Sequence, residues 1–224
     1  DGTFNMDPMT LWFNTPDTHT LCRAGGNGPE HPSQLYAIRK YIYPFVLKSG
    51  PVTFLDYGCG SGTTYEALKK TILESGLIRY RGIDIIPKNI AWCKEQWPEA
   101  NVGINAEIHR ICEPDKSYDV VYSRHVVDHM ESFEKALDEH CRVARTFVII
   151  VLWRPFIEAE EHEIKHIVDQ GKVYADEYTN DYARRKVMAA LVQKESDGWQ
   201  TREVAEGIGK EVKGFDTVLV LERR

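Results

Sequence analysis

Three glycines and one aspartate have the types and spacing of a nucleotide-cofactor site. The segment FLDYGCGSGTTY, residues 54–65, carries Gly58, Gly60 and Gly62 directly after a short apolar run. Such glycines let the chain turn sharply and bring main-chain atoms against a ligand. Asp84 stands 22 residues after Gly62, at the end of the next apolar run, where a carboxylate accepts both ribose hydroxyls. A ligand-free turn and a surface acid are the separate alternatives, but together the two features favour a cofactor.

The residues around the glycines indicate which cofactor this is. The dinucleotide pattern G-x-G-x-x-G/A fails at its last position, which is Thr63 here. Asp56 places a carboxylate beside the glycines, where a dinucleotide would bring a negative pyrophosphate. An acid suits a cofactor that carries an ammonium and a sulfonium, so charge complementarity favours S-adenosylmethionine (SAM).

His125 is the candidate general base. It follows Ser123 and Arg124 at the carboxyl end of the strand expected at 117–123, the sheet edge where ligands bind in such sheets. If the acceptor of the methyl group is a hydroxyl, a base that removes its proton assists the reaction. The alternative is that His125 only packs against the cofactor or caps the next turn. His129 follows four residues later, where a structural role is favoured over a metal-binding pair.

A second pattern points to different chemistry. The stretch EEHEIKHIV, residues 160–168, matches the zinc-protease motif H-E-x-x-H at His162, Glu163 and His166. On a helix, this spacing puts two imidazoles on one face with the glutamate as general base. A zinc protease also needs a third protein ligand, and none follows at a recognisable spacing. We therefore predict an incidental match in a helical lid, where His162 or His166 could rival His125 as the base.

Apolar runs and helical periodicity alternate between residues 51 and 153. The expected strands are 52–58, 80–86, 101–106, 117–123 and 146–153, and the expected helices are 33–48, 63–75, 87–98 and 132–144. This alternation is typical of right-handed βαβ units in a mainly parallel sheet covered on both faces. The fold class is therefore α/β: a Rossmann-like seven-stranded mainly parallel sheet with helices on both faces and an antiparallel C-terminal hairpin.

The rhythm of the sequence divides the chain into four segments. They are an N-terminal arm and helix that cap the site (1–48), the SAM-binding core (49–153), a helical insertion that serves as acceptor-site lid (154–198), and a strand pair that completes the sheet (199–224). Aromatic side chains gather in the arm and the insertion, where they form either a pocket for a flat or apolar acceptor or ordinary core. They are Trp12, Phe13, Tyr36, Trp153, Phe156, Tyr174, Tyr178 and Tyr182.

The composition limits the kinds of partner and the cellular location that we expect. The formal net charge is -6 and the pI is about 5.8, whereas a duplex nucleic-acid binder normally presents a basic face, so we expect no nucleic-acid partner. Five cysteines, odd in number and widely spread, indicate a reducing compartment, and we expect a cytoplasmic protein. No apolar run reaches the ~18 residues of a transmembrane helix, so we expect no membrane insertion. The oligomeric state is left open.

These motifs together resemble those of a known family. FLDYGCGSG, then GIDII, then SYDVVYSRHVVDHMESFEKALDEHCRVA are similar to the class I SAM-dependent methyltransferases, in the small-molecule, type 11-like branch. The resemblance covers about residues 50–153 and is more specific for the cofactor than for the acceptor. It implies SAM as cofactor, S-adenosyl-L-homocysteine as product and no required metal.

The resemblance also implies contacts to the cofactor. Tyr57, Gly58 and Gly60 are expected to face the methionine part, with main-chain carbonyls receiving the ammonium. Asp56 is expected to hold the loop and the ammonium, and Asp84 the ribose.

Further contacts are implied toward the adenine and the methyl group. Ile85 is expected to pack on the adenine, Glu107 to accept from its amino group and the Ile108 amide to reach the ring, although Asn105-Ala106 is a competing alignment. Ser123 and Arg124 are expected to border the methionine and the transferred methyl.

The function predicted from the sequence is methyl transfer to the oxygen or nitrogen of a small-molecule acceptor. A methyltransferase for protein or RNA, or a non-catalytic nucleotide-binding module on the same fold, are the alternatives. The N/D-P-P-Y/F tetrapeptide that serves base or amide nitrogens is absent, because the sequence after the fourth strand is Ser123-Arg124-His125-Val126.

Overall fold

The computed structural model describes most of the chain after residue 27. The described residues are 28–105, 107, 110–130, 132–159, 161–169, 172–209 and 216–224, and for 162–169 and 172–179 the backbone alone is described. The predictions for Trp12, Phe13 and Ile108, and for the side chains of His162, His166, Tyr174 and Tyr178, lie outside the described parts.

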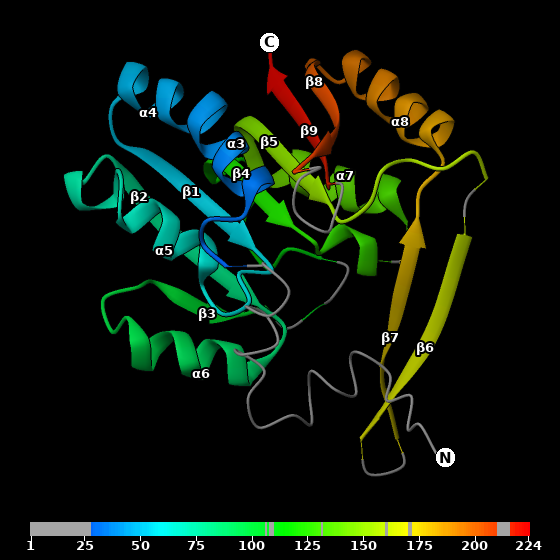
Figure 1. Cartoon of the computed structure of the whole chain (residues 1–224), viewed down its shortest axis with the longest axis horizontal. Coiled ribbons are helices and arrows are strands. Elements are labelled where there is room, and N and C mark those ends of the chain that lie inside the picture. The colour runs from blue at the N-terminus through cyan, green and yellow to red at the C-terminus, as the bar shows by residue number, and fades with distance from the viewer. Residues whose placement is uncertain are drawn as a thin grey trace.

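A seven-stranded sheet forms the centre of the molecule (Figure 1). Its order is β3-β2-β1-β4-β5-β9-β8. All neighbours from β3 to β5 are parallel, and β9 runs antiparallel between β5 and β8. The strands are β1 (Val52–Tyr57), β2 (Ile78–Asp84), β3 (Val102–Ile104), β4 (Tyr118–Arg124), β5 (Ala144–Leu152), β8 (Trp199–Ile208) and β9 (Asp216–Arg223). The predicted fold class is confirmed.

Helices cover both faces of this sheet. On one face lie α3 (Pro32–Ala37), the π-helical turn η2 (Ile38–Ile42), α4 (Tyr43–Ser49), α5 (Thr63–Lys69), η3 (Leu73–Ser75) and α6 (Pro87–Gln96). On the other lie η4 (Val127–His129), α7 (Phe133–Val143) and α8 (Arg184–Ser196). Each face buries its own apolar cluster, which fixes the sheet between two layers as apolar strands require.

The N-terminal helix belongs to this core. Ala37, Ile38 and Val46 are fully buried against the sheet. The helix changes to π-type hydrogen bonding at Ile38–Ile42, just before Pro44, whose missing N–H removes one bond of the regular ladder. The segment thus brings its first residues, from His31 onward, to the loops at the carboxyl ends of β1 and β4.

The prediction of a helical insertion over 154–198 is wrong for its first half, whereas residues 184–196 are helical. Residues 161–181 form the antiparallel hairpin β6 (Glu161–Asp169) and β7 (Lys172–Asp181), which stands apart from the main sheet in Figure 1. The sequence carried a hairpin signal in Gln170-Gly171, between two runs with strand-like alternation.

Helix α8, the helical part of the segment predicted as a lid, packs on the core. Its side chains Val187 and Leu191 are buried in the same cluster as α7, and Lys194 forms an ion pair with Asp138 of α7. It is the crossover helix between the parallel strands β5 and β8, so only the hairpin is inserted into the fold.

The hairpin is anchored at its base. Asn180 donates from Nδ2 to the carbonyl of Met130 at 2.6 Å, and the Tyr182 hydroxyl donates to the carbonyl of Val127 at 2.7 Å. Both acceptors adjoin or lie in η4, directly after the fourth strand, so the hairpin is tied to the edge of the sheet that carries His125. Among the described helices, none is both long enough and apolar enough to cross a membrane.

Candidate active site

The glycine loop is built by close packing. Gly58, Gly60 and Gly62 have φ values of 73°, 51° and 70°, the left-handed region that glycine enters without strain. A Cβ at Gly58 would lie 2.2 Å from Cγ2 of Val126. The loop therefore abuts the residue that follows His125, which joins the predicted cofactor region to the predicted base.

Asp84 closes the loop from the neighbouring strand. Its Oδ2 accepts from the Gly60 amide at 2.8 Å, and its Oδ1 accepts from the Ile86 amide at 2.8 Å. Burial raises the pKa of this carboxyl, opposed by these hydrogen bonds. Nδ2 of Asn89 also donates to Oδ1 at 3.3 Å, and a carboxylate has about four acceptor positions, so capacity remains for a ligand hydroxyl. Ile85, half-buried beside it, is available to pack on a ring.

Asp56 lies beneath the loop. The Tyr80 hydroxyl donates to its Oδ2 at 2.7 Å, and the carboxyl is almost fully buried. Burial raises the pKa of Asp56 to about 7, against the opposing hydrogen bonds from Tyr80 and Thr64. A nearby cation would favour the ionised form, which is the property the predicted ammonium contact needs.

Two buried thiols flank the same loop. Cys93 on α6 lies with its Sγ 3.4 Å from the carbonyl oxygen of Gly60, and Cys59 occupies the loop itself. A hydrogen bond from Cys93 and burial raise the pKa of the Cys59 thiol well above its usual value. Neither thiol is poised as a nucleophile, as expected for a loop that binds a ligand by shape.

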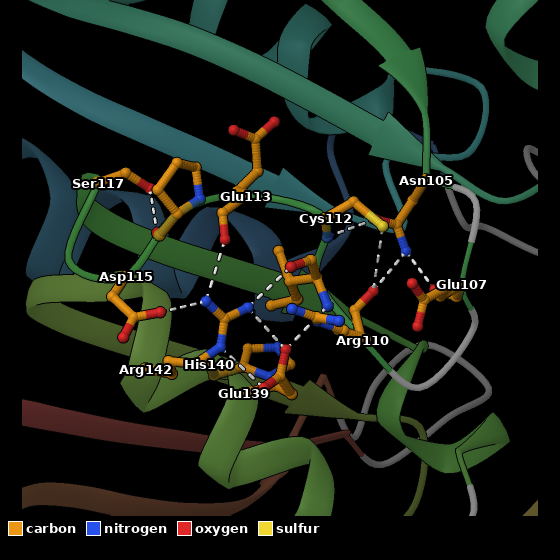
Figure 2. A network of polar contacts seen from close by, with 12 residues as sticks. Asn105, Glu107, Arg110, Cys112, Glu113, Asp115, Ser117, Glu139, His140 and Arg142 are labelled. Atoms are coloured by element: carbon orange, nitrogen blue, oxygen red, sulfur yellow. Dashed lines mark hydrogen bonds and ion pairs between the residues drawn. The ribbon is translucent and has the colours of Figure 1, made fainter.

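The segment predicted to contact the adenine is held in place, in its described part, by side-chain hydrogen bonds (Figure 2). Asn105 is buried after β3, where its Nδ2 donates to the carbonyls of Glu107 and Arg110 and its Oδ1 accepts from the Cys112 amide at 2.9 Å. Farther along, Arg142 of α7 holds the carbonyls of residues 111 and 113.

This arrangement bears on the two competing alignments. The side-chain amide of Asn105 is committed to the loop, whereas Glu107 is exposed and its carboxylate makes no hydrogen bond or ion pair within the described residues. The geometry therefore favours Glu107 over Asn105 as the acceptor for a ligand's amino group.

Ser123 and Arg124 point to opposite faces of the sheet. The Ser123 hydroxyl bonds Nε2 of His140 on α7 at 2.9 Å, which leaves only its backbone near the glycine loop through pairing with Tyr57. The Arg124 guanidinium donates from Nη2 to Oγ1 of Thr63 at 3.1 Å, at the first residue of α5. Arg124 is thus the one of the two whose side chain reaches the loop-facing side.

His125 sits in a constrained conformation. Its φ is 56°, which is uncommon for a residue other than glycine, and its amide donates to the carbonyl of Val151 at 2.9 Å. Its Nε2 lies 2.9 Å from Oδ2 of Asp216, and its ring stacks on Trp153 at 6.0 Å. Non-glycine residues held in such conformations gather at functional sites because the surrounding structure must enforce them.

The pattern H-E-x-x-H lies on a strand. His162 and His166 both belong to β6, where residues four apart are separated by about 13 Å along the chain. The one-turn spacing that a zinc protease requires is therefore not formed.

Of the predicted aromatic cluster, Trp153 alone among the described side chains stacks on His125. Its indole is 45% exposed, and His129 lies 6.4 Å from it. Tyr182 is buried in the core, and Tyr36 bonds Glu203 on β8. A cavity of about 690 Å³ opens beside Phe156 and α8, but none of the predicted site residues lines it.

Three buried oxygen atoms test whether the residues fit a polar cofactor. Oγ of Ser61 in the glycine loop, Oδ1 of Asn89 beside Asp84, and the hydroxyl of Tyr122 have no hydrogen-bond partner among the described residues. Buried polar atoms ordinarily have a hydrogen-bond partner, and a polar ligand beside these three atoms would provide it. Together with the glycine loop and the Asp84 carboxylate, these atoms fit a nucleoside with a charged tail.

Comparison with known proteins decides the class. A family model described as "Methyltransferase domain" matches residues 55–152, which include the glycine loop, Asp84 and His125. This match and the sheet topology support a class I SAM-dependent methyltransferase domain over residues 55–152. The chain is accordingly an enzyme of the transferase class, with SAM as the supported cofactor.

Solved methyltransferase structures share the fold. Magnesium protoporphyrin IX methyltransferase from Synechocystis PCC 6803, with bound S-adenosylhomocysteine, is 14% identical, with 97% of this chain and 99% of that chain covered and a TM-score of 0.65. A SAM-dependent methyltransferase from Mesorhizobium loti is 14% identical, with coverage of 88% and 100% and a TM-score of 0.61. A further one from Aquifex aeolicus is 20% identical, with coverage of 88% and 98% and a TM-score of 0.52.

Two residues that the structure places beside His125 were missed by the sequence analysis. Asp216 opens β9, and His31 precedes α3, so both are far from the family motifs in sequence. The sequence did contain a signal for Asp216, because this residue begins the predicted antiparallel strand. Such a strand starts at the sheet edge where its parallel neighbours end. His31 lay in a segment read as irregular, and only the packing of α3 brings it to the site.

Proposed function

We propose that this enzyme transfers the methyl group of SAM to a hydroxyl or amine of a small-molecule acceptor, with His125 as general base. The contact between Gly58 and Val126 carries the proposal, because it sets the cofactor loop directly against the strand exit that presents His125. General bases of this kind contribute about 10²–10⁴-fold to a rate.

The assignment of the cofactor-holding residues combines the geometry of the site with the contacts that the family resemblance implies. We assign the ribose hydroxyls to Asp84, the adenine to Ile85, Ile108 and Glu107, and the methionine ammonium to the main chain of Tyr57, Gly58 and Gly60 together with Asp56. The backbone at Ser123 and the Arg124 side chain border the methionine. When bound, SAM supplies an electrophilic methyl carbon on a positively charged sulfur.

The reaction needs little else from the protein. The acceptor's lone pair forms the new bond to the methyl carbon, and the electron pair of the broken carbon–sulfur bond stays on sulfur, which leaves neutral S-adenosylhomocysteine. The acceptor's proton passes to His125. The chain's task is to orient the acceptor in line and exclude water, so we propose that no metal is required.

The surroundings of His125 favour a small methyl acceptor with a flat face. The exposed face of Trp153, next to His125 and His129, offers a stacking surface at the sheet edge. The net charge of -6 argues against a nucleic-acid acceptor. The base of the β6–β7 hairpin is tied to the same edge, and we propose that the hairpin takes the lid role. We further propose a cytoplasmic location.

The test combines binding with turnover. SAM, and not NAD, should raise the melting temperature, and labelled methyl should pass to members of a panel of small hydroxylated or amino aromatics but not to bulk RNA or protein. His125→Asn is the key variant, because asparagine tolerates φ near +60° and is no base. It should keep its Kd for SAM within about twofold and lose about 100-fold or more in kcat.

Other outcomes would identify the alternatives. Labelling of RNA or protein alone would favour a macromolecular acceptor. Binding of SAM without transfer to any of the three would favour a non-catalytic module. Full activity of His125→Asn would show that His125 is not the general base. His162→Ala and His166→Ala would then be tested in turn.

A further inference from the structure

The carboxylate of Asp216 is the meeting point of three side chains from distant parts of the chain. Its Oδ2 accepts from the Ser33 hydroxyl at 2.5 Å and from Nε2 of His125 at 2.9 Å, and it lies 3.6 Å from Nδ1 of His31. Asp216 is 1% exposed. Contacts of this kind tie β4, β9 and the start of α3 together at one point.

The sheet fixes the position of this carboxylate. β9 runs antiparallel to β5, with Thr217 opposite Leu152, so its first residue lies at the edge where the parallel strands end. The Thr217 hydroxyl donates to the carbonyl of Arg154 at 3.0 Å and secures the same edge. A group on a rigid strand end is well suited to orient a catalytic side chain.

Hydrogen-bond chemistry assigns the tautomer of His125. Burial alone would raise the pKa of Asp216, but the hydrogen bonds from His125 and Ser33 lower it below its usual value. An ionised carboxylate only accepts, so Nε2 of His125 must carry the proton. The lone pair is then on Nδ1, which has no hydrogen-bond partner among the described residues.

His31 does not compete for the role of base at this carboxylate. The Ser33 hydroxyl gives its proton to Asp216 and therefore accepts from Nδ1 of His31, at 2.9 Å. Burial, followed by the nearby charge of Arg124, lowers the pKa of His31 to about 4. His31 is thus neutral at neutral pH, and its ring packs edge-on against His125 at 5.6 Å.

We propose that Asp216 is the positioning residue of the reaction: it holds His125 with the proton on Nε2, aims Nδ1 at the acceptor, and balances the imidazolium that forms. This inference rests on the proposed function of His125. The acceptor's proton moves to Nδ1, the Nε2 proton stays on His125, and Asp216 remains ionised, as in other histidine–carboxylate pairs. Among the described residues, the other ionisable groups around this pair are His31 and Asp128, with Arg124 acting on His31 and His129 acting on Asp128.

The decisive measurement is the tautomer of His125 in the enzyme with SAM and without acceptor. Long-range ¹H–¹⁵N spectra of imidazole-labelled protein should show the proton on Nε2 in the wild type at neutral pH. Asp216→Asn should shift the population toward the proton on Nδ1, because the asparagine amide can donate to Nε2. It should lower kcat about 100-fold with the Kd for SAM within about twofold.

A control separates this hydrogen bond from a general charge effect. Asp128→Asn neutralises a buried carboxylate that makes no hydrogen bond to His125, keeps an oxygen that can accept from the Trp153 amide, and should leave the tautomer unchanged. Asp216→Glu keeps the carboxylate and should retain the proton on Nε2. An equal tautomer shift in Asp128→Asn would overturn the inference.

The outcomes also distinguish this inference from the proposed function. A wild-type His125 with its proton on Nδ1 overturns the inference, and this result needs no variant to fold. An unchanged tautomer and kcat in Asp216→Asn, with an inactive His125→Asn, overturns it while the base role stands. Normal turnover of both His125→Asn and Asp216→Asn overturns both.

Discussion

The glycine loop and the Asp216 cluster lie at the same edge of the sheet but are assembled in different ways. The loop is formed by residues 56–63 and one neighbouring strand end, through main-chain atoms and glycine conformations. The cluster joins side chains of Ser33, His125 and Asp216, which are up to 183 residues apart. A short segment can therefore encode the cofactor half, whereas the catalytic half depends on the whole fold.

This contrast predicts that variants of the two regions affect different properties of the enzyme. Variants of the loop should change the affinity for SAM, and variants of the cluster should change kcat at unchanged affinity. The contact between Gly58 and Val126 is the exception, because it belongs to both regions.

The largest effect is expected from Gly58→Ala. Its Cβ would overlap Val126 at 2.2 Å and would sit at φ 73°, so we expect a loss of about 2–4 kcal/mol in the free energy of unfolding. Gly76→Ala is the matched control, with the same φ of 73° and nothing within 4 Å, and should lose only about 1 kcal/mol. Urea titration measures both.

Adding Val126→Ala to Gly58→Ala should restore part of the lost stability, because it removes the methyl groups that the new Cβ meets. If Gly58→Ala and Gly76→Ala are equally destabilised, the packing link between loop and base is not what constrains Gly58.

The next largest effect is expected from Asp84→Ala, which disturbs the glycine loop and leaves the Asp216 cluster intact. It removes the acceptor of the Gly60 amide and the assigned ribose contact, so the Kd for SAM should rise about 10- to 100-fold, since hydrogen bonds to charged groups contribute about 1.5–3 kcal/mol. Calorimetric titration measures it, with the exposed Asp138→Asn as control. A Kd unchanged in Asp84→Ala would contradict the assignment.

Asp56 gives a pH-dependent effect. Because burial raises its pKa to about 7, the folded state binds this proton more tightly than the unfolded chain, whose aspartates titrate near pH 4. The contribution is fully present below about pH 4 and is lost as the pH rises to about 7. Between pH 5 and pH 8, the wild type should therefore lose more unfolding free energy than Asp56→Asn. The exposed Asp115→Asn should follow the wild type.

Ser33→Ala should give the smallest effect, and it tests the Asp216 cluster. It removes one of the donors to Asp216 but leaves the His125 contact, so kcat should fall only about 2- to 10-fold, with the Nε2 tautomer and the Kd for SAM unchanged. A larger fall in kcat with a changed tautomer would mean that Ser33, and not Asp216 alone, sets the orientation of His125.

The limits of the sequence analysis follow the same division. The sheet could be predicted because its strands are continuous apolar runs between helices, and the loop because Gly58, Gly60 and Asp84 are close in sequence. Asp216 and His31 could not be paired with His125, since no local pattern records a contact formed by antiparallel insertion of β9 and by docking of α3.

The hairpin shows a different limit. Residues 160–168 contain an imidazole pair at helical spacing, and this pattern outweighed the glycine turn signal at residues 170–171. The side-chain period of a short polar segment is ambiguous without knowledge of what it packs against.

The packing of Cys59 and Cys93 around the Gly60 carbonyl has a practical consequence. Thiol reagents must reach the thiolate, so Cys59, which is buried and has a raised pKa, and Cys93, which is buried, are alkylated only when their surroundings open. The rate of modification at these two positions would report how often the loop opens, and saturating SAM should slow it, while the exposed Cys112 continues to react. The unmodified enzyme thus contains its own chemical probe of cofactor occupancy.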